Sequence, residues 1–206
     1  MSVIGNAAFF SQARVIPVLS VSSVAAGVET SRVLFEAGLR FQEVTLRTEW
    51  GLATIAAIRR ELPQVVVGAG TVLSPDLGQA ALDAGASFLV SPGTPEGLLQ
   101  FAAQCAPPFL PGAGTVAELM RLILEGCTAA KLFPVESLGG VSYIKALSGP
   151  LGAIKLCPSG GVNARNASNY LALDNVLGVA GSWMISRDAP QRTSELTRLA
   201  RQAAAL

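Results

Sequence analysis

The sequence predicts an α/β protein with the (β/α)8 TIM-barrel architecture, built as a single compact domain over residues 1–206. Three observations predict this fold. Eight short apolar, β-branched runs recur at intervals of roughly 20 to 27 residues, close to the length of one βα unit. Ala- and Leu-rich amphipathic stretches follow the runs after breaks rich in Gly, Pro, Ser and Thr. The runs are almost continuously apolar, which is typical of parallel strands covered on both faces.

The strand-like runs end in segments of a different character. In chain order the runs begin near Arg14 (RVIPVLSV), Arg40 (RFQEVTLR), Gln64 (QVVVGAG), Ser87 (SFLVSPG), Pro108 (PFLPGAG), Ala129 (AAKLFPV), Ala153 (AIKLCPSGG) and Asn175 (NVLGVAGS). The run ends are rich in Gly, Pro, Thr and Ser, as in EVTLRT, GAGTV, SPG, PGAGT, FPVE, PSGG and GSW. In a barrel these ends meet on one face, where exposed amides and hydroxyls favour a small, oxygen-rich ligand.

Helix-like segments fill the intervals, for example SVAAGVETSRVLFEAG, TVAELMRLILEG and SNYLALD. Gly38, Gly85 and Gly126 separate such segments from the next strand, which is typical of helix C-caps. Thr115 and Glu118 match the T-x-x-E pattern, which predicts a capping box at a helix start. Spacing alone does not show that the sheet closes, so a doubly wound open sheet is the alternative fold.

The composition excludes several classes of function. Apolar residues make up 50% of the chain and charged residues 14%, so the chain is expected to fold around a large core. The 15 Lys and Arg residues against 14 Asp and Glu residues give a net charge of +1. Such a balance provides no field for nucleic acid or an anionic membrane surface, and we expect neither as a partner. An anion must therefore be bound by local groups.

The absence of histidine excludes Ser-His-Asp and Cys-His hydrolysis and His-ligated zinc. Cys105, Cys127 and Cys157 lie far apart without a CxxC pattern, so we expect buried, reduced thiols rather than a zinc site or a disulfide framework. The N-terminus has no basic region before its apolar residues, and no apolar run reaches the ~18 residues of a membrane helix. We therefore expect a cytoplasmic protein.

A lysine among apolar neighbours is the first candidate for chemistry. Lys131 stands in AAKLFP, and burial in such a setting favours a neutral, nucleophilic amine that can form a Schiff base with a ketone. Lys155 in AIKLCP has the same offset from a proline, so the strand pattern does not separate the two. Lys145 lies in a helix-like stretch and is expected on the surface. The alternative for Lys131 is a stem that extends to the strand end.

Glu43 and Arg47 are the second candidates. If the odd positions of RFQEVTLR face inward, both residues share one side of a strand, about 13 Å apart. This spacing favours two functional points: Glu43 as a proton shuttle and Arg47 as a partner for a substrate carboxylate. The alternative is a structural Glu-Arg-Lys charge network in the centre of the barrel.

Two glycine-rich strand ends predict a phosphate site. In barrels the loops after the last two strands often hold phosphate, and here these loops contain Ser159-Gly160-Gly161 and Gly181-Ser182-Trp183. Glycines let backbone N–H groups approach an anion, and the hydroxyls add donors. The alternative role of these glycines is tight turning. In GAGTV, Thr71 can donate to a carboxylate.

Taken together, EVTLRT (43–48), GAGTV (68–72), SPG (91–93), KLFPVE (131–136), CPSGGV (157–162) and GSW (181–183) resemble the 2-keto-3-deoxy-6-phosphogluconate aldolase family, over about residues 15–183. The resemblance implies a homotrimeric (β/α)8 barrel that joins lysine to pyruvate as a Schiff base, without metal or cofactor. It implies a lyase that cleaves the phosphorylated keto acid to pyruvate and glyceraldehyde 3-phosphate, often with activity on 4-hydroxy-2-oxoglutarate.

Carried over by motif, the resemblance makes Lys131 the Schiff-base lysine and Glu43 the proton-transfer residue. Its implied substrate-binding residues are Arg47, Thr71, Pro92, Phe133, Ser159, Gly160, Gly161 and Ser182. Where the family commonly has Thr, Ala and Gly, this chain has Ser159, Val135 and Ala180, changes that concern phosphate affinity and pocket size.

Two other functions fit the same residues. A phosphosugar isomerase or epimerase would use Glu43 as its base, with Lys131 polarising a carbonyl. A non-catalytic barrel would only bind a phosphorylated metabolite.

Overall fold

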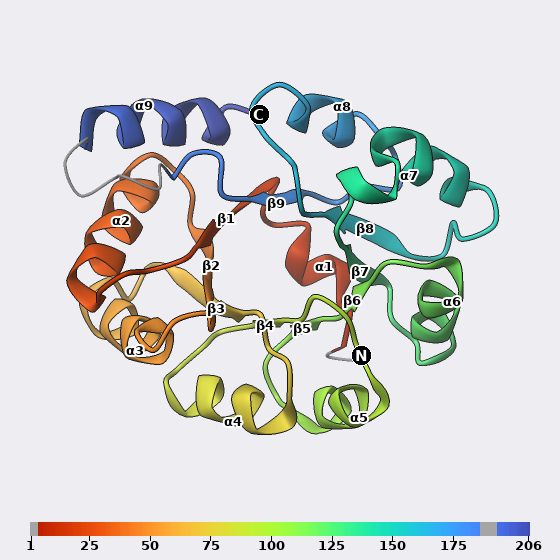
Figure 1. Ribbon diagram of the computed structural model, residues 1–206, viewed down its shortest axis with the longest axis horizontal. Coiled ribbons are helices and arrows are strands. Elements are labelled where there is room, and N and C mark those ends of the chain that lie inside the picture. Colours follow the sequence, from red (N-terminus) through yellow and green to blue (C-terminus); the bar gives the residue numbers. More distant parts are fainter. Residues whose placement is uncertain (1–3, 186–192) are drawn as a thin grey trace.

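The computed structural model describes residues 4–185 and 193–206, and Figure 1 shows most helices around the outside of a group of strands, with one short helix in the middle. The strands are β1 (Val15–Leu19), β2 (Phe41–Thr45), β3 (Val66–Gly70), β4 (Leu89–Val90), β5 (Phe109–Leu110), β6 (Gly112–Ala113), β7 (Ala129–Leu132), β8 (Lys155–Pro158) and β9 (Val179–Gly181). The helices are α1 (Ala7–Phe10), α2 (Val24–Glu36), α3 (Gly51–Glu61), α4 (Pro75–Asp83), α5 (Glu96–Gln104), α6 (Val116–Leu124), the 3-10 turn η1 (Glu136–Leu138), α7 (Gly140–Ser148), α8 (Ala167–Leu171) and α9 (Thr193–Ala204).

The strands form two parallel sheets, which confirms the predicted α/β class. One has six strands in the order β5-β4-β3-β2-β1-β9, and the other has the order β6-β7-β8. Parallel bridges at Leu156–Val176 and Ser159–Ala180 connect β8 to β9 and to the segment before it.

Each of the eight predicted runs contains a strand, but one prediction needs correction. The run at residues 108–114 contains two strands, β5 and β6, which belong to different sheets. Pro111 lies between them, and a proline has no N–H to donate to a sheet ladder.

Two apolar clusters fill the fold. The larger lies where the outward faces of the strands meet the helices; Leu34, Ile55 and Leu119 are examples. The smaller lies among inward-facing residues of the strands and includes Ile16 and Phe41. Strand residues therefore alternate between two cores, as expected for parallel strands buried on both faces.

The short helix α1, which the sequence pattern did not predict, packs against the starts of the strands. The rings of Phe9 and Phe10 lie 5.4 Å from Phe41 and 5.8 Å from Phe88, respectively, in edge-to-face contacts. The Phe88 ring fills the space that a Cβ at Gly68 would need. This aromatic group leaves the opposite, carboxyl ends of the strands for other residues.

The predicted helix ends are confirmed. Gly38, Gly85 and Gly126 follow helices with φ angles of 101°, 89° and 80°, in the left-handed region that glycine adopts without steric cost. Thr115 and Glu118 form the capping box of α6. Backbone N–H groups of Gly114 and Thr115 donate to the Glu118 carboxylate and lower its pKa.

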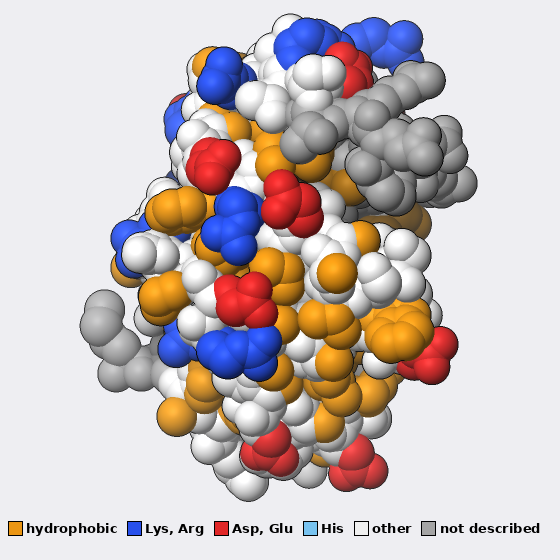
Figure 2. All heavy atoms as spheres, turned by 90° about the vertical axis from the view of Figure 1, so that its left-hand side faces the viewer, with side chains coloured by type: hydrophobic (Ala, Val, Ile, Leu, Met, Phe, Trp, Pro, Cys, Tyr) orange, Lys and Arg blue, Asp and Glu red, His pale blue; other side chains and the backbone are white. Residues whose placement is uncertain are grey.

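The surface carries charges of both signs. Figure 2, which looks onto the left-hand side of Figure 1, shows Lys and Arg side chains interspersed with Asp and Glu rather than gathered by sign. Ion pairs such as Arg32–Glu29 at 3.7 Å and Arg60–Glu61 at 2.6 Å lie on α2 and α3. In the described ranges, no helix has the length and apolar character needed to cross a bilayer.

The aromatic group makes a testable contribution to stability. We expect Phe88→Ala to lower the free energy of unfolding by about 3–5 kcal/mol, because it opens a cavity in a fully buried site. Leu124→Ala, at a side chain that is 86% exposed, should change it by less than about 0.5 kcal/mol. Urea denaturation of both variants measures the difference, and similar values for the two would contradict this description of the core.

Candidate active site

Lys131 and Glu43 form a buried ion pair between two strands that do not adjoin. Lys131 lies on β7 between Gly112 and Cys157 of the neighbouring strands, and Glu43 lies on β2. Lys131 Nζ is 3.3 Å from Glu43 Oε1, and the side chains are 5% and 1% exposed. Among the described residues, Glu43 is the carboxylate within ion-pair distance of this amine, as a buried charge requires.

The surroundings of this pair are apolar or small. The Phe133 ring centroid lies 5.8 Å from Lys131 Nζ. Burial raises the pKa of the adjacent Cys157 thiol to about 12, so this sulfur is a neutral neighbour rather than a second nucleophile. A Cβ at Gly70 would overlap Glu43 Oε1, so glycine at this position leaves the space that the carboxylate occupies.

The strand register separates the two lysines that the sequence pattern left equivalent. Lys131 pairs with Cys157, whereas Lys155 pairs with Ala129, two residues nearer the start of β7. Lys155 is exposed, and its Nζ donates to the Asp174 carbonyl at 2.8 Å. Only Lys131 of the two therefore lies in a buried setting with a carboxylate partner.

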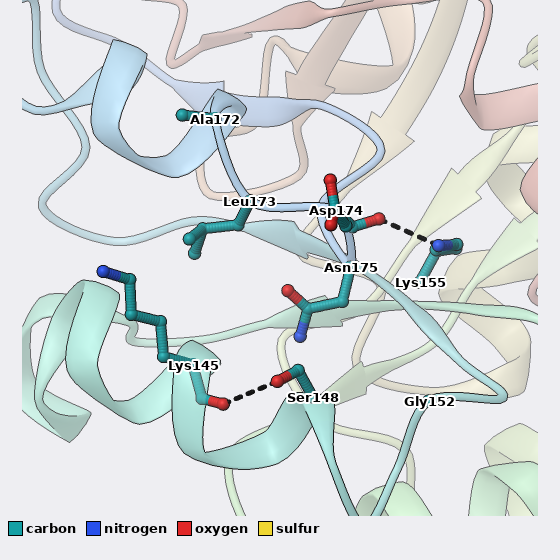
Figure 3. Close-up of a pocket in the computed structure, with 8 residues that line it drawn as sticks. All are labelled: Lys145, Ser148, Gly152, Lys155, Ala172, Leu173, Asp174 and Asn175. Carbon is teal, nitrogen blue, oxygen red and sulfur yellow. Dashed lines mark hydrogen bonds between the residues drawn. The ribbon is translucent and has the colours of Figure 1, made fainter.

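Lys155 instead lines a surface hollow of about 420 Å³ beside α7. Its other lining residues are Lys145, Ser148, Gly152, Ala172, Leu173, Asp174 and Asn175. Figure 3 shows the two lysine amines at opposite sides of this hollow, and Lys145 is exposed on α7 as predicted. The hollow lies at the start of β8, at the opposite end of that strand from Ser159 and Gly160.

Arg47 and Thr71 meet just beyond the ends of β2 and β3. Arg47 Nε donates to Thr71 Oγ1 at 3.0 Å, which leaves the threonine O–H free to donate to a ligand. Thr71 has φ 61°, a left-handed conformation that costs a β-branched residue roughly 1–3 kcal/mol and often marks functional sites. In the described structure Glu43 pairs with Lys131, and Arg47 bonds to Thr71 instead. The alternative prediction of a Glu-Arg-Lys charge network therefore holds for the Glu-Lys pair and not for Arg47.

The loop after β8 contains three predicted phosphate contacts. Ser159 is buried, and its neighbours Gly160 and Gly161 have φ angles of +90° and +92°, which favour glycine. A Cβ at Gly160 would lie 3.0 Å from carbons of the Phe133 ring, so the loop packs closely on this aromatic side chain. The Phe133–Pro134 peptide bond that follows is cis.

The remaining predicted residues also follow strand ends. Ser182 is exposed directly after β9, whose Ala180 is bridged to Ser159. Pro92 follows β4, and its backbone lies where a Cβ at Gly112 would be placed. All the predicted site residues therefore lie on a strand or within three residues after one: Glu43, Arg47, Thr71, Pro92, Lys131, Phe133, Ser159, Gly160, Gly161 and Ser182.

The structure adds residues to which the sequence analysis gave no role. The carboxylate of Glu136, the last residue of KLFPVE, accepts hydrogen bonds from Tyr170 and Asn166 beside the Ser159–Gly161 loop. Gly70 was part of a quoted motif, but its contact with Glu43 depends on strand register. In neither case did the sequence alone carry a signal for the contact.

Comparison with known proteins agrees with this geometry. The model of the KDPG and KHG aldolase family matches residues 7–200. The chain belongs to this aldolase family. The KHG/KDPG aldolase of Escherichia coli (strain K12) is 41% identical over 191 residues, which cover 92% of this chain and 90% of that protein. The 2-dehydro-3-deoxy-phosphogluconate aldolase of Dickeya dadantii is 41% identical, over 93% of this chain and 91% of its own.

Solved structures of family members have the same fold. KDPG aldolase from Legionella pneumophila, with pyruvate captured at low pH as a covalent carbinolamine intermediate, has a TM-score of 0.92 at 34% identity and covers 96% of this chain and 97% of its own. The Zymomonas mobilis enzyme, solved with 3-phosphoglycerate, has a TM-score of 0.92 at 34% identity over 97% and 95% of the two chains. The resemblance predicted from the motifs is confirmed.

The buried pair predicts a strong coupling between its members. We expect Lys131→Met and Glu43→Gln each to cost about 3–5 kcal/mol of unfolding free energy, because each leaves a buried polar or charged partner uncompensated. The double variant should cost clearly less than the sum, since it leaves no buried charge. Chemical denaturation of the four proteins at neutral pH gives this cycle, and additive losses would show that the two groups do not interact.

Proposed function

We propose that this aldolase cleaves 2-dehydro-3-deoxy-6-phosphogluconate to pyruvate and glyceraldehyde 3-phosphate through a Schiff base on Lys131, and that it also acts on 4-hydroxy-2-oxoglutarate. The observation that carries the proposal is the buried Lys131–Glu43 pair at 3.3 Å. Membership of the KDPG and KHG aldolase family supports it, and so does the pyruvate carbinolamine of the Legionella relative.

Proton transfer within the pair begins the reaction. Glu43 accepts a proton from the Lys131 ammonium, and the neutral amine attacks the C2 ketone of the substrate. The carbinolamine hydroxyl takes a proton delivered by Glu43, through a water, and leaves as water. The resulting iminium is the electron sink into which the C3–C4 bonding pair moves when that bond breaks.

Glu43 also completes the cycle. As the C3–C4 bond breaks, the C4 hydroxyl loses its proton to Glu43 and becomes the aldehyde that departs. The remaining enamine is protonated at its former C3, and water hydrolyses the iminium to release pyruvate and restore Lys131. One carboxylate beside one amine thus serves every proton transfer.

Contacts at both ends of the substrate hold the scissile bond near the amine. We assign the substrate carboxylate to the Arg47 guanidinium and the Thr71 hydroxyl, which already meet at 3.0 Å. We assign the phosphate to Ser159, Gly160, Gly161 and Ser182, with Pro92 and Phe133 lining the space between. Fixing both ends lowers the entropy that is lost between the bound substrate and the transition state.

The same proposal extends to the architecture. We infer that the strands form one (β/α)8 barrel, with β5 and β6 sharing one position, in a single domain over residues 1–206. The short link through Pro111 and the Ser159–Ala180 bridge support closure on both sides of the smaller sheet. A homotrimer, which follows from the family resemblance, and a cytoplasmic location, which follows from the sequence features above, are part of the proposal.

Borohydride trapping tests the central step. With pyruvate and borohydride, peptide mapping should find the reduced adduct on Lys131, because within the described part of the chain only this lysine combines burial with a carboxylate partner. Lys131→Ala should abolish both the adduct and pyruvate release in a coupled assay, whereas Lys155→Ala, the matched control, should retain both.

An adduct on Lys155, or no adduct, would refute the Schiff-base assignment. A protein that interconverts phosphosugars without an adduct would be the isomerase or epimerase. Binding of the phosphorylated keto acid without turnover would identify a non-catalytic barrel.

Kinetics on two substrates distinguish the proposed carboxylate site from the proposed phosphate site. Arg47→Ala should raise KM for both the phosphorylated substrate and 4-hydroxy-2-oxoglutarate by about tenfold or more, since it removes a charge-assisted bond to a carboxylate that both carry. Ser182→Ala should raise KM for the phosphorylated substrate alone, by about three- to tenfold. Steady-state kinetics on both substrates tests this, and a Ser182→Ala effect on both would contradict the phosphate assignment.

A further inference from the structure

The Glu136 carboxylate lies at the centre of a group of hydrogen bonds behind the Ser159–Gly161 loop. Its Oε1 accepts a hydrogen bond from the Tyr170 hydroxyl and another from Asn166 Nδ2 at 3.1 Å. The Tyr170 residue is fully buried. Burial and the neighbouring Glu136 carboxylate raise the pKa of that hydroxyl, so it stays protonated and remains a donor at neutral pH.

The same residue contacts the loop directly. The backbone N–H of Glu136 donates to the Gly160 carbonyl at 3.1 Å, and that of Val135 donates to the Ser159 carbonyl at 2.8 Å. The Glu136 side chain lies against Gly161: a Cβ there would be 2.7 Å from Glu136 Cβ.

Asparagine side chains hold the third carbonyl of the loop. Asn166 Nδ2 lies 3.2 Å from the Gly161 carbonyl, and Asn163 Nδ2 donates to the same oxygen at 3.0 Å. All three loop carbonyls, from Ser159 to Gly161, are thus bonded to the segments behind the loop. Asn166 joins the two halves of the arrangement, because its amide contacts both Glu136 and Gly161.

This arrangement leaves amide groups available to an anion. Within residues 4–185 and 193–206, neither Gly160 N–H nor Gly161 N–H donates a hydrogen bond. Both glycines have positive φ angles, +90° and +92°, and successive backbone N–H groups in such turns can bind an anion. The loop therefore has two backbone donors without a protein partner among the described residues, while its three carbonyls are all bonded.

We propose that Glu136 is a positioning residue that holds the Ser159–Gly161 loop ready for the substrate phosphate and so sets the preference for phosphorylated over unphosphorylated keto acids. The proposal rests on the phosphate site of the proposed function. Glu136 acts through its shape and its hydrogen bonds, since its charge would by itself repel a phosphate. A glutamine keeps an acceptor oxygen for Tyr170 and Asn166, so Glu136→Gln should preserve the position of the loop.

Kinetics on two substrates test the proposal. Glu136→Ala should raise KM for 2-dehydro-3-deoxy-6-phosphogluconate by about tenfold, while KM for 4-hydroxy-2-oxoglutarate and both kcat values stay within about twofold. Glu136→Gln should keep the wild-type ratio of the two KM values. Ser137→Ala, a change at the exposed neighbouring residue, is the matched control and should also keep that ratio.

A second variant tests the same role with a smaller risk of unfolding the protein. Tyr170→Phe keeps the buried ring and removes only one donor to Glu136, so it should shift the KM ratio in the same direction by about threefold. Borohydride trapping with pyruvate, which lacks a phosphate, should be unchanged in each variant.

The outcomes separate this inference from the proposed function. Equal KM increases for both substrates, or an unchanged ratio in both Glu136→Ala and Tyr170→Phe, would overturn the positioning role alone. A wild-type enzyme that releases pyruvate from neither substrate would overturn the proposed function and this inference with it. A change of the ratio in Glu136→Gln equal to that in Glu136→Ala would also overturn the positioning role, because it would show that the charge of Glu136, and not its hydrogen bonding, sets the ratio.

Discussion

The pair of opposite charges enclosed between β2 and β7 is the interaction on which the site depends. Lys131 and Glu43 are 5% and 1% exposed, so each has given up nearly all of its hydration. Removing two charges from water costs several kcal/mol per ion, which only close and well-directed partners offset. Small neighbours make this geometry possible, because Gly70 leaves space for the carboxylate and Gly112 lies beside the lysine in register. A stable fold thus retains a lysine amine in a nearly dry setting.

The inward-facing residues change from apolar to charged along the length of the strands. Phe41 on β2 and Ala129 on β7 belong to the apolar cluster near the strand starts, and two residues further on the same strands carry Glu43 and Lys131. Residues two apart on a strand face the same side, so the same inward face carries the apolar cluster near the strand starts and the Lys131–Glu43 pair further along. The aromatic rings of α1 pack against the first layer, on the side away from Glu43 and Lys131.

Local structure was predicted well because it depends on residues that are neighbours in the sequence. The eight strand-containing runs, the glycine C-caps and the Thr115–Glu118 capping box all depend on short-range steric and hydrogen-bonding preferences. Register is different, since it depends on pairing between distant segments. Lys131 and Lys155 have the same offset from a proline, yet β7 and β8 pair with a shift of two residues. That shift decides which lysine is buried, and before the structure only the family motif distinguished them.

Contacts between loops were the least accessible to sequence reasoning. Arg47 and Thr71 were both assigned to a carboxylate, but their bond to each other follows from the pairing of β2 with β3. The split of one predicted strand at Pro111 and the position of α1 likewise depend on the assembled sheet. Glu136 belonged to a recognised motif, and its partners Asn166 and Tyr170 lie 30 and 34 residues away.

The six residues of KLFPVE connect the two halves of the site in one covalent segment. Lys131 provides the amine, Phe133 lies against both that amine and Gly160, and the backbone N–H of Glu136 holds the Gly160 carbonyl. The proposed carboxylate contacts, Arg47 and Thr71, follow β2 and β3 and share none of these bonds. Under the proposed assignments, a substrate without a phosphate still meets Arg47, Thr71 and the amine, which gives a structural reason for one chain to act on both kinds of keto acid.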